Sequence, residues 1–328
     1  MYSIGIYVEE GEEDRARSVT IRVRRPGLRV IHPGKFLFRS PAARRESLLR
    51  AAWSAPELFE TGIVRAHLFP LRPVSRERWD ALLAVSFPVP LGGGQPGTVS
   101  RREFGAVLRR GGAVVKRLSR LVTLEPERPE LVAQPHVTFL ERLEILPGTY
   151  ELTAVLSDPA ETDPHAVRVT LVVPEVPRKE LFLVDPILGR PAEGNLVVLG
   201  GGAGEHDDAI GGERSFEPLL VQRLDEPTDF VSLTQACYVG AQKRGKVKDA
   251  RGGTVHRSLL DAVGVDVGAL DPVDVTLDAE GQVRCQNLVD IVPGSRLRAG
   301  EYAFEATLQS VRDGAGAPVR VRFAVAAR

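Results

Sequence analysis

The chain has 328 residues, of which 43% are hydrophobic and 26% charged, so it is long enough for two domains with substantial cores. Lysine plus arginine and aspartate plus glutamate number 43 each, and this balance gives no global field that would favour nucleic acid, an anionic membrane or an acidic substrate. No apolar run approaches the roughly 18 residues of a spanning helix. We therefore expect no nucleic-acid binding, no membrane insertion and no signal peptide within the chain.

One helix is predicted near the N-terminus, over residues 41–59. Ser40 can cap its first turn, and Pro41 suits the first helical position. Elsewhere 32 glycines and 24 prolines are spread without a short period, which is typical of many turns between short strands. The segment that follows the helix has apolar residues at every odd position, namely Trp79, Ala81, Leu83, Val85, Phe87, Val89 and Leu91. A strand would place all of them on one face, which we predict to be a core face.

A β-hairpin is predicted next, because residues 104–110 and 113–122 flank Gly111 and Gly112, which tolerate the positive φ angles of a tight turn. Its basic residues are expected on a solvated side, where they discourage edge pairing: Arg109, Arg110, Lys116, Arg117 and Arg120. Alternation resumes in residues 150–156 and 167–173, which read as consecutive antiparallel strands. The class predicted from these elements is all-β.

An internal repeat appears when the chain is aligned with itself at an offset of 152 residues, without a gap. The first copy has Gly148, Tyr150, Ala154, Leu156, Val167, Arg168, Val169 and Val173, and the second has Gly300, Tyr302, Ala306, Leu308, Val319, Arg320, Val321 and Val325. This period is too long for a solenoid and predicts two similar domains. In each copy a tyrosine, Tyr150 or Tyr302, follows a turn glycine at the start of a strand, which resembles the tyrosine corner of Greek-key sandwiches. We therefore expect two immunoglobulin-like β-sandwiches in tandem.

Between the two copies, residues 194–213 contain seven glycines but match no phosphate-binding spacing, and the acidic residues at 205–208 would repel a phosphate. A flexible connector is the interpretation that we favour, and the cluster at 205–208 is not expected to bind a metal. The loop from Asp158 to His165 offers carboxylates to calcium, yet its prolines fit plain turn chemistry equally well. No nucleophile elbow or histidine-based catalytic pattern is recognisable, so we predict no catalytic, cofactor or metal residues.

Cys237 and Cys285 are the two cysteines, and both lie in the second copy. Each has the same parity as its apolar neighbours, so both are expected to face a core. A disulfide forms if their Cα atoms lie within about 7 Å, and two separately buried thiols fit the pattern equally well.

The opening of the chain carries two further motifs, Tyr2-Ser-Ile-Gly-Ile-Tyr7 and Arg22-Val-Arg-Arg-Pro-Gly-Leu-Arg-Val30, and a third follows at Leu146-Pro-Gly-Thr-Tyr-Glu-Leu152. Together they resemble the C-terminal β-rich region of bacterial von Willebrand factor A-related proteins, where such strands end the A domain and a helix and β-rich part follow. The resemblance implies that Met1 begins a truncated reading frame and that the protein is extracytoplasmic. The metal-binding Asp-x-Ser-x-Ser of A domains does not occur in the chain, so no metal-site residue is transferred.

The domain plan that follows has five parts. Residues 1–38 form a β-hairpin that ends an A-like domain, 39–60 a linking helix, 61–178 the first sandwich, 179–214 a glycine-rich linker and 215–328 the second sandwich. The function that we expect is a non-catalytic, extracytoplasmic structural or protein-interaction module accessory to an A-like domain, with a protein partner of unknown identity. Alternatives are a carbohydrate-binding or enzyme-accessory module, which needs an exposed row of aromatics, and a hydrolase with a site between the sandwiches.

Overall fold

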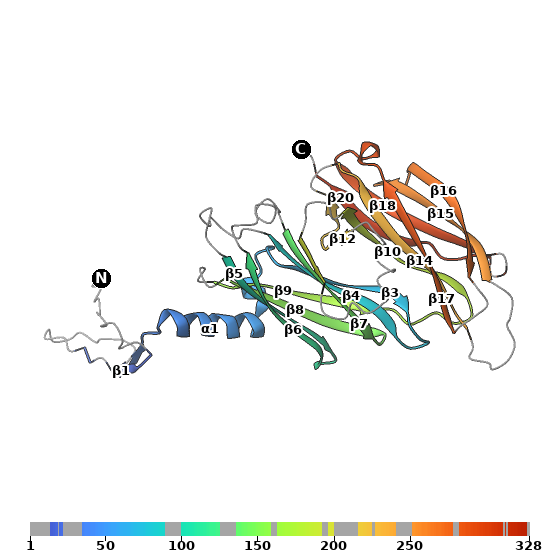
Figure 1. Cartoon of the computed structure of the whole chain (residues 1–328). Coiled ribbons are helices and arrows are strands. Elements are labelled where there is room, and N and C mark those ends of the chain that lie inside the picture. The colour runs from blue at the N-terminus through green and yellow to red at the C-terminus, as the bar shows by residue number, and fades with distance from the viewer. Residues whose placement is uncertain are drawn as a thin grey trace, which may run out of the picture.

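The computed structural model describes residues 14–18, 20–21, 35–88, 100–124, 136–158, 163–191, 196–199, 216–224, 227–240, 251–277, 282–310, 312 and 314–326. Within these residues the structure consists almost entirely of β-strands, which form two sandwiches packed against each other (Figure 1). The all-β, immunoglobulin-like prediction is confirmed. We call the sheet of each sandwich that faces the other sandwich its inner sheet, and the remaining sheet its outer sheet.

The first sandwich has an inner sheet with the strand order β11-β7-β4-β3 and an outer sheet with the order β6-β5-β8-β9. Its strands are β3 (Arg65–Pro73), β4 (Trp79–Pro88), β5 (Ser100–Arg110), β6 (Ala113–Leu124), β7 (His136–Ile145), β8 (Gly148–Ser157), β9 (His165–Val173) and β11 (Leu196–Leu199). Counted along the chain, the first, second and fifth strands form the inner sheet, and the third, fourth, sixth and seventh form the outer one. This is an immunoglobulin-like arrangement, to which β11 adds a parallel strand beside β7.

The second sandwich repeats this arrangement, with an inner sheet β12-β10-β14-β17 and an outer sheet β13-β20-β18-β15-β16. Its strands are β10 (Leu181–Pro191), β12 (Phe216–Pro218), β13 (Arg223–Leu224), β14 (Phe230–Val239), β15 (Arg251–Asp261), β16 (Asp266–Leu277), β17 (Val283–Val292), β18 (Gly300–Ser310), β19 (Gly314–Ala315) and β20 (Val319–Val325), with a 3-10 helix η3 (Gly294–Arg296) before β18. The first, second and fifth of its seven principal strands again form the inner sheet.

The sequence repeat corresponds to the last two strands of each sandwich. In β8 and β9 Tyr150 pairs with Leu171, and in β18 and β20 Tyr302 pairs with Phe323, so the register is the same at the offset of 152 residues. The turn glycines also correspond, since Gly112 has a φ of 82° and its counterpart Gly264, in the equivalent turn of the second sandwich, has a φ of 85°. The two sandwiches therefore share the conformation of this turn as well as the pairing.

The predicted linker over residues 179–214 needs correction, because it contains the first strand of the second sandwich. Strand β10 pairs with β14 and buries Leu181, Leu183 and Leu188 in the second core. A register shift between Val184 and Ile187 interrupts its alternation, which explains why the sequence pattern did not indicate a strand. Strand β11 lies in the same range, and the glycines at 200–212 lie outside the described residues.

The predicted helix is shorter than expected. It is divided into α1 (Pro41–Ser54) and a 3-10 turn, η1 (Pro56–Phe59), because the residue before Pro56 is disfavoured in the helical region. The Ser40 hydroxyl accepts a hydrogen bond from the Ala43 N–H at 3.2 Å, as a cap should. Two short strands precede the helix, β1 (Ala16–Ser18) and β2 (Lys35–Leu37), which pair only with each other among the described residues. The motifs at residues 2–7 and 22–30 lie outside the described residues.

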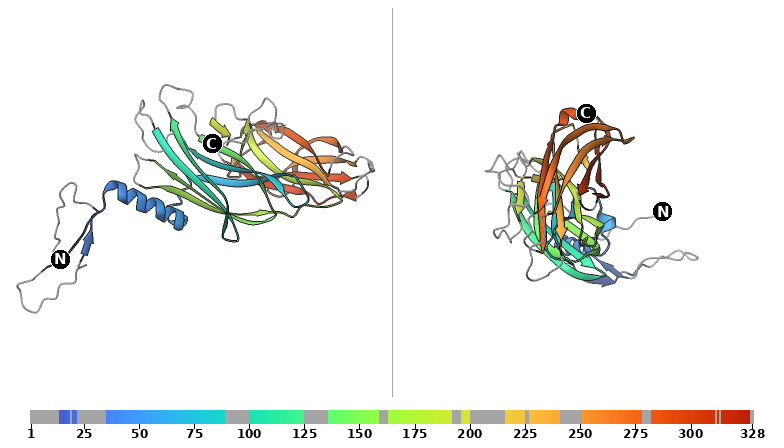
Figure 2. Two further views of the ribbon diagram at one scale, coloured as in Figure 1. Left: turned by 60° about the horizontal axis from the view of Figure 1, so that its bottom comes forward. Right: turned by 90° about the vertical axis from the view of Figure 1, so that its right-hand side faces the viewer.

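Helix α1 contacts the outer sheet of the first sandwich through its C-terminal turns and projects away from it at its N-terminus (Figure 2). Ala52 is fully buried against Val155 of β8 and Ala166 of β9. The Trp53 ring lies over Gly105 of β5, where an added Cβ would come within 2.7 Å of the ring. This glycine is therefore required for the helix to approach the sheet closely.

Candidate functional site

The junction between the two sandwiches buries strands β4 and β14 on both faces. Every residue from Trp79 to Phe87 of β4 is buried, and nearly all of β14 is buried as well. In a two-layer sandwich one face of each sheet is commonly solvated. Here the second face of β4, with Leu82 and Ala84, packs in one cluster with Leu233 of β14, and the inner sheets enclose a third apolar layer.

The predicted core stripe of β4 is confirmed over the described residues. Trp79, Ala81, Leu83, Val85 and Phe87 all belong to the core of the first sandwich. Val89 and Leu91 lie outside the described residues.

A charged cluster lies within the junction, on the face of β4 opposite the apolar stripe. Asp80 is almost completely buried, and its carboxylate accepts hydrogen bonds from the Arg142 guanidinium of β7. The Nε atom of Arg72 on β3 lies 3.5 Å from the same carboxylate. One buried anion is thus held between two guanidinium groups that remain partly exposed. Sequence reasoning missed this cluster, although an aspartate inside an otherwise apolar strand was a visible signal.

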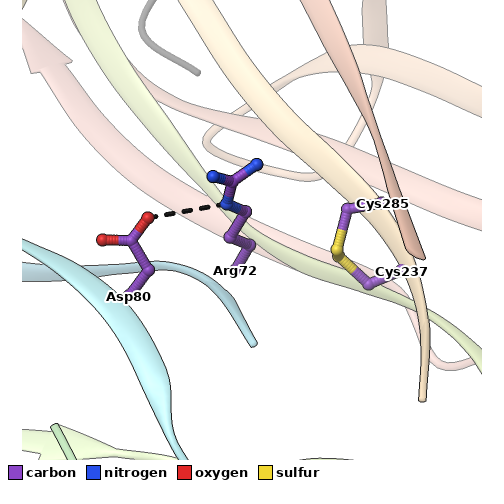
Figure 3. The surroundings of a disulfide bond; sticks show 4 residues. All are labelled: Arg72, Asp80, Cys237 and Cys285. Atoms are coloured by element: carbon purple, nitrogen blue, oxygen red, sulfur yellow. Dashed lines mark ion pairs between the residues drawn. A yellow bond between two sulfur atoms is a disulfide. The ribbon is translucent and has the colours of Figure 1, made fainter. Parts of the chain in front are cut away.

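Cys237 and Cys285 lie in the inner sheet of the second sandwich, on the face that is turned toward the first sandwich. They are directly opposite each other in β14 and β17, with Cα atoms 4.2 Å apart, and are joined by a disulfide. Figure 3 shows Arg72 between the Asp80 carboxylate and the disulfide. The parity of the cysteines indicates burial, but the core they contact is that of the first sandwich, around Trp79, and not that of their own.

Polar contacts across the junction hold its two ends. The Arg76 guanidinium, in the β3–β4 connection, donates two hydrogen bonds of 3.1 and 2.8 Å to the Gly240 carbonyl just after β14. Elsewhere the Thr138 hydroxyl of β7 donates to the Glu217 carboxylate of β12. Because each contact joins one sandwich to the other, they fix the relative orientation of the two inner sheets.

His67 of β3 lies beside the junction, on the same face of the strand as Phe69, and the two rings are 4.3 Å apart between centroids. Burial lowers the pKa of His67 below 6.5. In the unfolded chain the imidazole takes up a proton near its ordinary pKa while the folded protein keeps it neutral, so stability is lost as the pH falls below about 6.5.

We therefore expect the His67→Gln variant to lose less stability than wild type between about pH 7.5 and about pH 5.5. Urea unfolding at the two pH values measures the difference. His256→Gln, in which the lost histidine is exposed on β15, is the matched control. An equal loss in wild type and His67→Gln would contradict the expectation.

Both tyrosines at the starts of β8 and β18 contact the backbone four residues upstream. The Tyr150 hydroxyl donates to the Leu146 carbonyl at 2.6 Å, and the Tyr302 hydroxyl accepts from the Arg298 N–H at 2.9 Å. These are the contacts of tyrosine corners. Burial raises the pKa of Tyr150, so this hydroxyl stays protonated and can donate.

Replacing Tyr150 by phenylalanine should lower the free energy of unfolding by about 1–2 kcal/mol, because the Leu146 carbonyl loses its donor next to a buried ring. Tyr302→Phe should cost less, since Tyr302 is only partly buried and water can replace the hydroxyl. Chemical denaturation of the two variants in parallel tests this order, and the reverse order would contradict it.

The Asp158 side chain, considered above as a calcium ligand, is already paired. It lies 3.0 Å from the Arg102 guanidinium of β5, and both side chains are buried, with 7% and 2% of their surface exposed. Glu161 lies outside the described residues. Asp158 therefore acts in a buried ion pair at the end of the first sandwich.

The predicted solvated side of the first hairpin is confirmed for Arg110, Arg117 and Arg120, which are exposed. Lys116 and Arg120 of β6 also pair with Glu141 of β7, whose buried carboxylate lies 2.8 Å from the Lys116 Nζ atom, while 36% and 43% of the two basic side chains stay exposed. Arg120 lies over the Phe139 ring, 5.5 Å from its centroid. The aliphatic parts of Lys116 and Arg120 cover the apolar edge of the sandwich, and their charged ends pair with Glu141. The prediction of a solvated side did not include these contacts.

Other site types have little support in the part of the chain that the structure describes. Those residues contain no group of three or more metal-binding side chains and no helix long and apolar enough to span a membrane. Their aromatic side chains are all buried or half-buried, so the exposed aromatic row needed by a carbohydrate-binding surface is not among them. A groove of about 420 Å³ beside α1 has Trp53, Gly105, Val107, Glu103 and Arg117 among its lining residues.

Comparisons with known proteins give no family. No family profile and no curated protein matches the sequence. Among solved structures, the Bacteroides uniformis β-glucuronidase 2, covalently bound to cyclophellitol-6-carboxylate aziridine, is 11% identical, with a TM-score of 0.25, over 76% of this chain and 26% of that one. The fibronectin(III)-like modules of Clostridium thermocellum CbhA are 12% identical, with a TM-score of 0.17, over 79% of this chain and 94% of theirs.

The BSP domain of a biofilm-associated protein is 9% identical, with a TM-score of 0.21, over 89% of this chain and 56% of that one. The chain spans about a quarter of the glucuronidase, at 26% of its length. At such TM-scores these likenesses carry no argument about activity, and the assignment as a β-sandwich module rests on the strand order itself.

Proposed function

We propose that the chain is a non-catalytic structural or protein-interaction module in which two sandwiches act as one rigid body. The observation that supports this most directly is the burial of β4 and β14 on both faces. If the two domains moved independently, the outward faces of β4 and β14 would be exposed to water. The hydrogen bonds from Arg76 to the Gly240 carbonyl and from Thr138 to Glu217 hold the inner sheets together, which is the use expected in a scaffold.

A rigid junction predicts a narrow distribution of distances between the sandwiches. Spin labels at Val172→Cys and Val263→Cys would report it, because these side chains are 71% and 83% exposed and lie in different sandwiches. The native cysteines are joined in a disulfide and do not react with the label. A label pair within one sandwich, Val263→Cys with Val289→Cys, is the control for label flexibility. A much broader distribution for the first pair would overturn the rigid-body proposal.

The extracytoplasmic location is part of the proposal, and the disulfide supports it. Structural disulfides persist in oxidising compartments and are rare in the reducing cytosol. Fractionation of cells that express the natural gene, with antibodies against this chain, tests the location. Recovery of the protein in the cytosol with free thiols would reject it.

The association with an A-like domain rests on the resemblance of the opening motifs, and the N-terminal elements support it. Strands β1 and β2 have three residues each, and a two-stranded sheet is marginally stable alone. Asp14 joins them to the helix by accepting hydrogen bonds from the Ser40 N–H at 3.0 Å and its hydroxyl at 2.6 Å. The hairpin and α1 are thus suited to connect the first sandwich to another domain.

The DNA upstream of the Met1 codon provides the decisive test of this association. An open frame that encodes Asp-x-Ser-x-Ser within an A-like domain, together with a signal peptide, would support it. An in-frame stop codon close upstream, with no A-like domain encoded beside it, would reject it while leaving the rigid-body proposal intact.

A further inference from the structure

The core of the second sandwich contains a polar cluster that none of the roles above uses. Ser232 and Thr234 are neighbours on the inward face of β14, with 0% and 1% of their surface exposed. Asp290 lies directly opposite Ser232 on β17, and directly opposite residues in a sheet have Cβ atoms about 4.5–5.5 Å apart. Arg257 reaches this point from β15 in the outer sheet. Four polar side chains therefore converge inside an otherwise apolar core.

The protein satisfies only part of this cluster. The Arg257 guanidinium donates to one oxygen of Asp290 and to the Asp271 carbonyl. Four atoms are left without a hydrogen-bond partner among the described residues: the hydroxyls of Ser232 and Thr234, Nε of Arg257 and the second carboxylate oxygen of Asp290. A buried polar atom without a partner destabilises the folded protein, so four in one place favour a compensating ligand.

The chemistry of these atoms selects the ligand. A cation would be repelled by Arg257 and an anion by Asp290, while an apolar molecule would leave the hydroxyls unpaired. The set contains a donor, an acceptor and two hydroxyls that act as either, and a buried water needs two to four such partners. Ser232 and Thr234 are two residues apart along the strand, about 7 Å, which is a separation that a chain of two hydrogen-bonded waters spans.

We propose that the second sandwich binds a small cluster of ordered water that joins Ser232, Thr234, Asp290 and Arg257. The water connects Ser232, Thr234 and Asp290 of the inner sheet to Arg257 of the outer sheet. Burial raises the pKa of Asp290 despite the nearby Arg257, which agrees with a carboxylate that the protein itself solvates incompletely.

The test is Thr234→Val, which removes one hydroxyl and keeps the shape. If water binds there, the variant should lose long-lived internal water in oxygen-17 relaxation dispersion and unfold with an equilibrium constant about fivefold larger. If the hydroxyl is simply unpaired, removing it should leave the unfolding constant unchanged or smaller. That result, or an unchanged relaxation dispersion, would overturn the proposal.

Thr138→Val is the matched control, because Thr138 is equally buried but hydrogen-bonds to protein groups, Ser86 and Glu217. It should destabilise the protein without changing the internal water signal. Ser232→Ala provides a second variant at the proposed site, with the same expected loss of water signal, should Thr234→Val fail to fold.

Discussion

Replacing Asp158 by asparagine is expected to lower the free energy of unfolding by about 3–5 kcal/mol. The substitution keeps the shape of the side chain but removes the negative charge that lies 3.0 Å from the Arg102 guanidinium. Since only 2% of the Arg102 side chain is exposed, solvent cannot compensate the charge left behind. Denaturant unfolding of the variant measures the loss.

The double variant Arg102→Met/Asp158→Asn is the informative control. It removes both charges, so it should be more stable than Asp158→Asn alone, because replacing a whole buried pair is often nearly neutral. Measurements with calcium and with a chelator separate the ion pair from the calcium hypothesis, since the ion pair predicts the same loss in both. A loss that appears only with calcium, or additive losses in the double variant, would contradict the ion-pair account.

The repeated strands were predictable because their information is local. Alternation in β8 and β9 places apolar residues on one face, and a turn glycine with a tyrosine two residues later marks where each of β8 and β18 begins. The same signals recur at a fixed offset in the second sandwich, so the sequence alone established two similar domains. The matching glycines at 112 and 264 extend the correspondence to an earlier turn.

The junction was not predicted, because no sequence pattern indicates that the second face of β4 also packs against another sheet. The odd residues of β4 already account for one core, and Leu82 and Ala84 on the opposite face gave no separate signal of a second partner. Strand β10 was mistaken for a linker because Pro186 and a register shift break its alternation. The alternation of residues along the strand likewise indicated that Cys237 is buried, but alternation alone does not show which of the two apolar layers Cys237 packs against.

The disulfide itself leads to the second large expected effect. Replacing both Cys237 and Cys285 by alanine, or reducing the wild-type protein in its unfolded state, should lower the free energy of unfolding by roughly 4 kcal/mol. In the chain-entropy description the loss arises because the bond closes a loop of 48 residues in the denatured chain. Strands β14 and β17 remain paired along ten residues without it, so the fold should persist.

Unfolding curves with and without reductant, measured for wild type and for the double alanine variant, separate the effect of the disulfide from any other effect of the reductant. Reductant should destabilise wild type and leave the variant unchanged, and intact mass should show wild type two hydrogens lighter before reduction. Because Cys237 has no exposed surface, reductant should act at the rate of unfolding and not on the folded protein. Identical wild-type curves in both conditions would mean that the cysteines are two buried thiols, and the support that the bond gives to an oxidising compartment would then be lost.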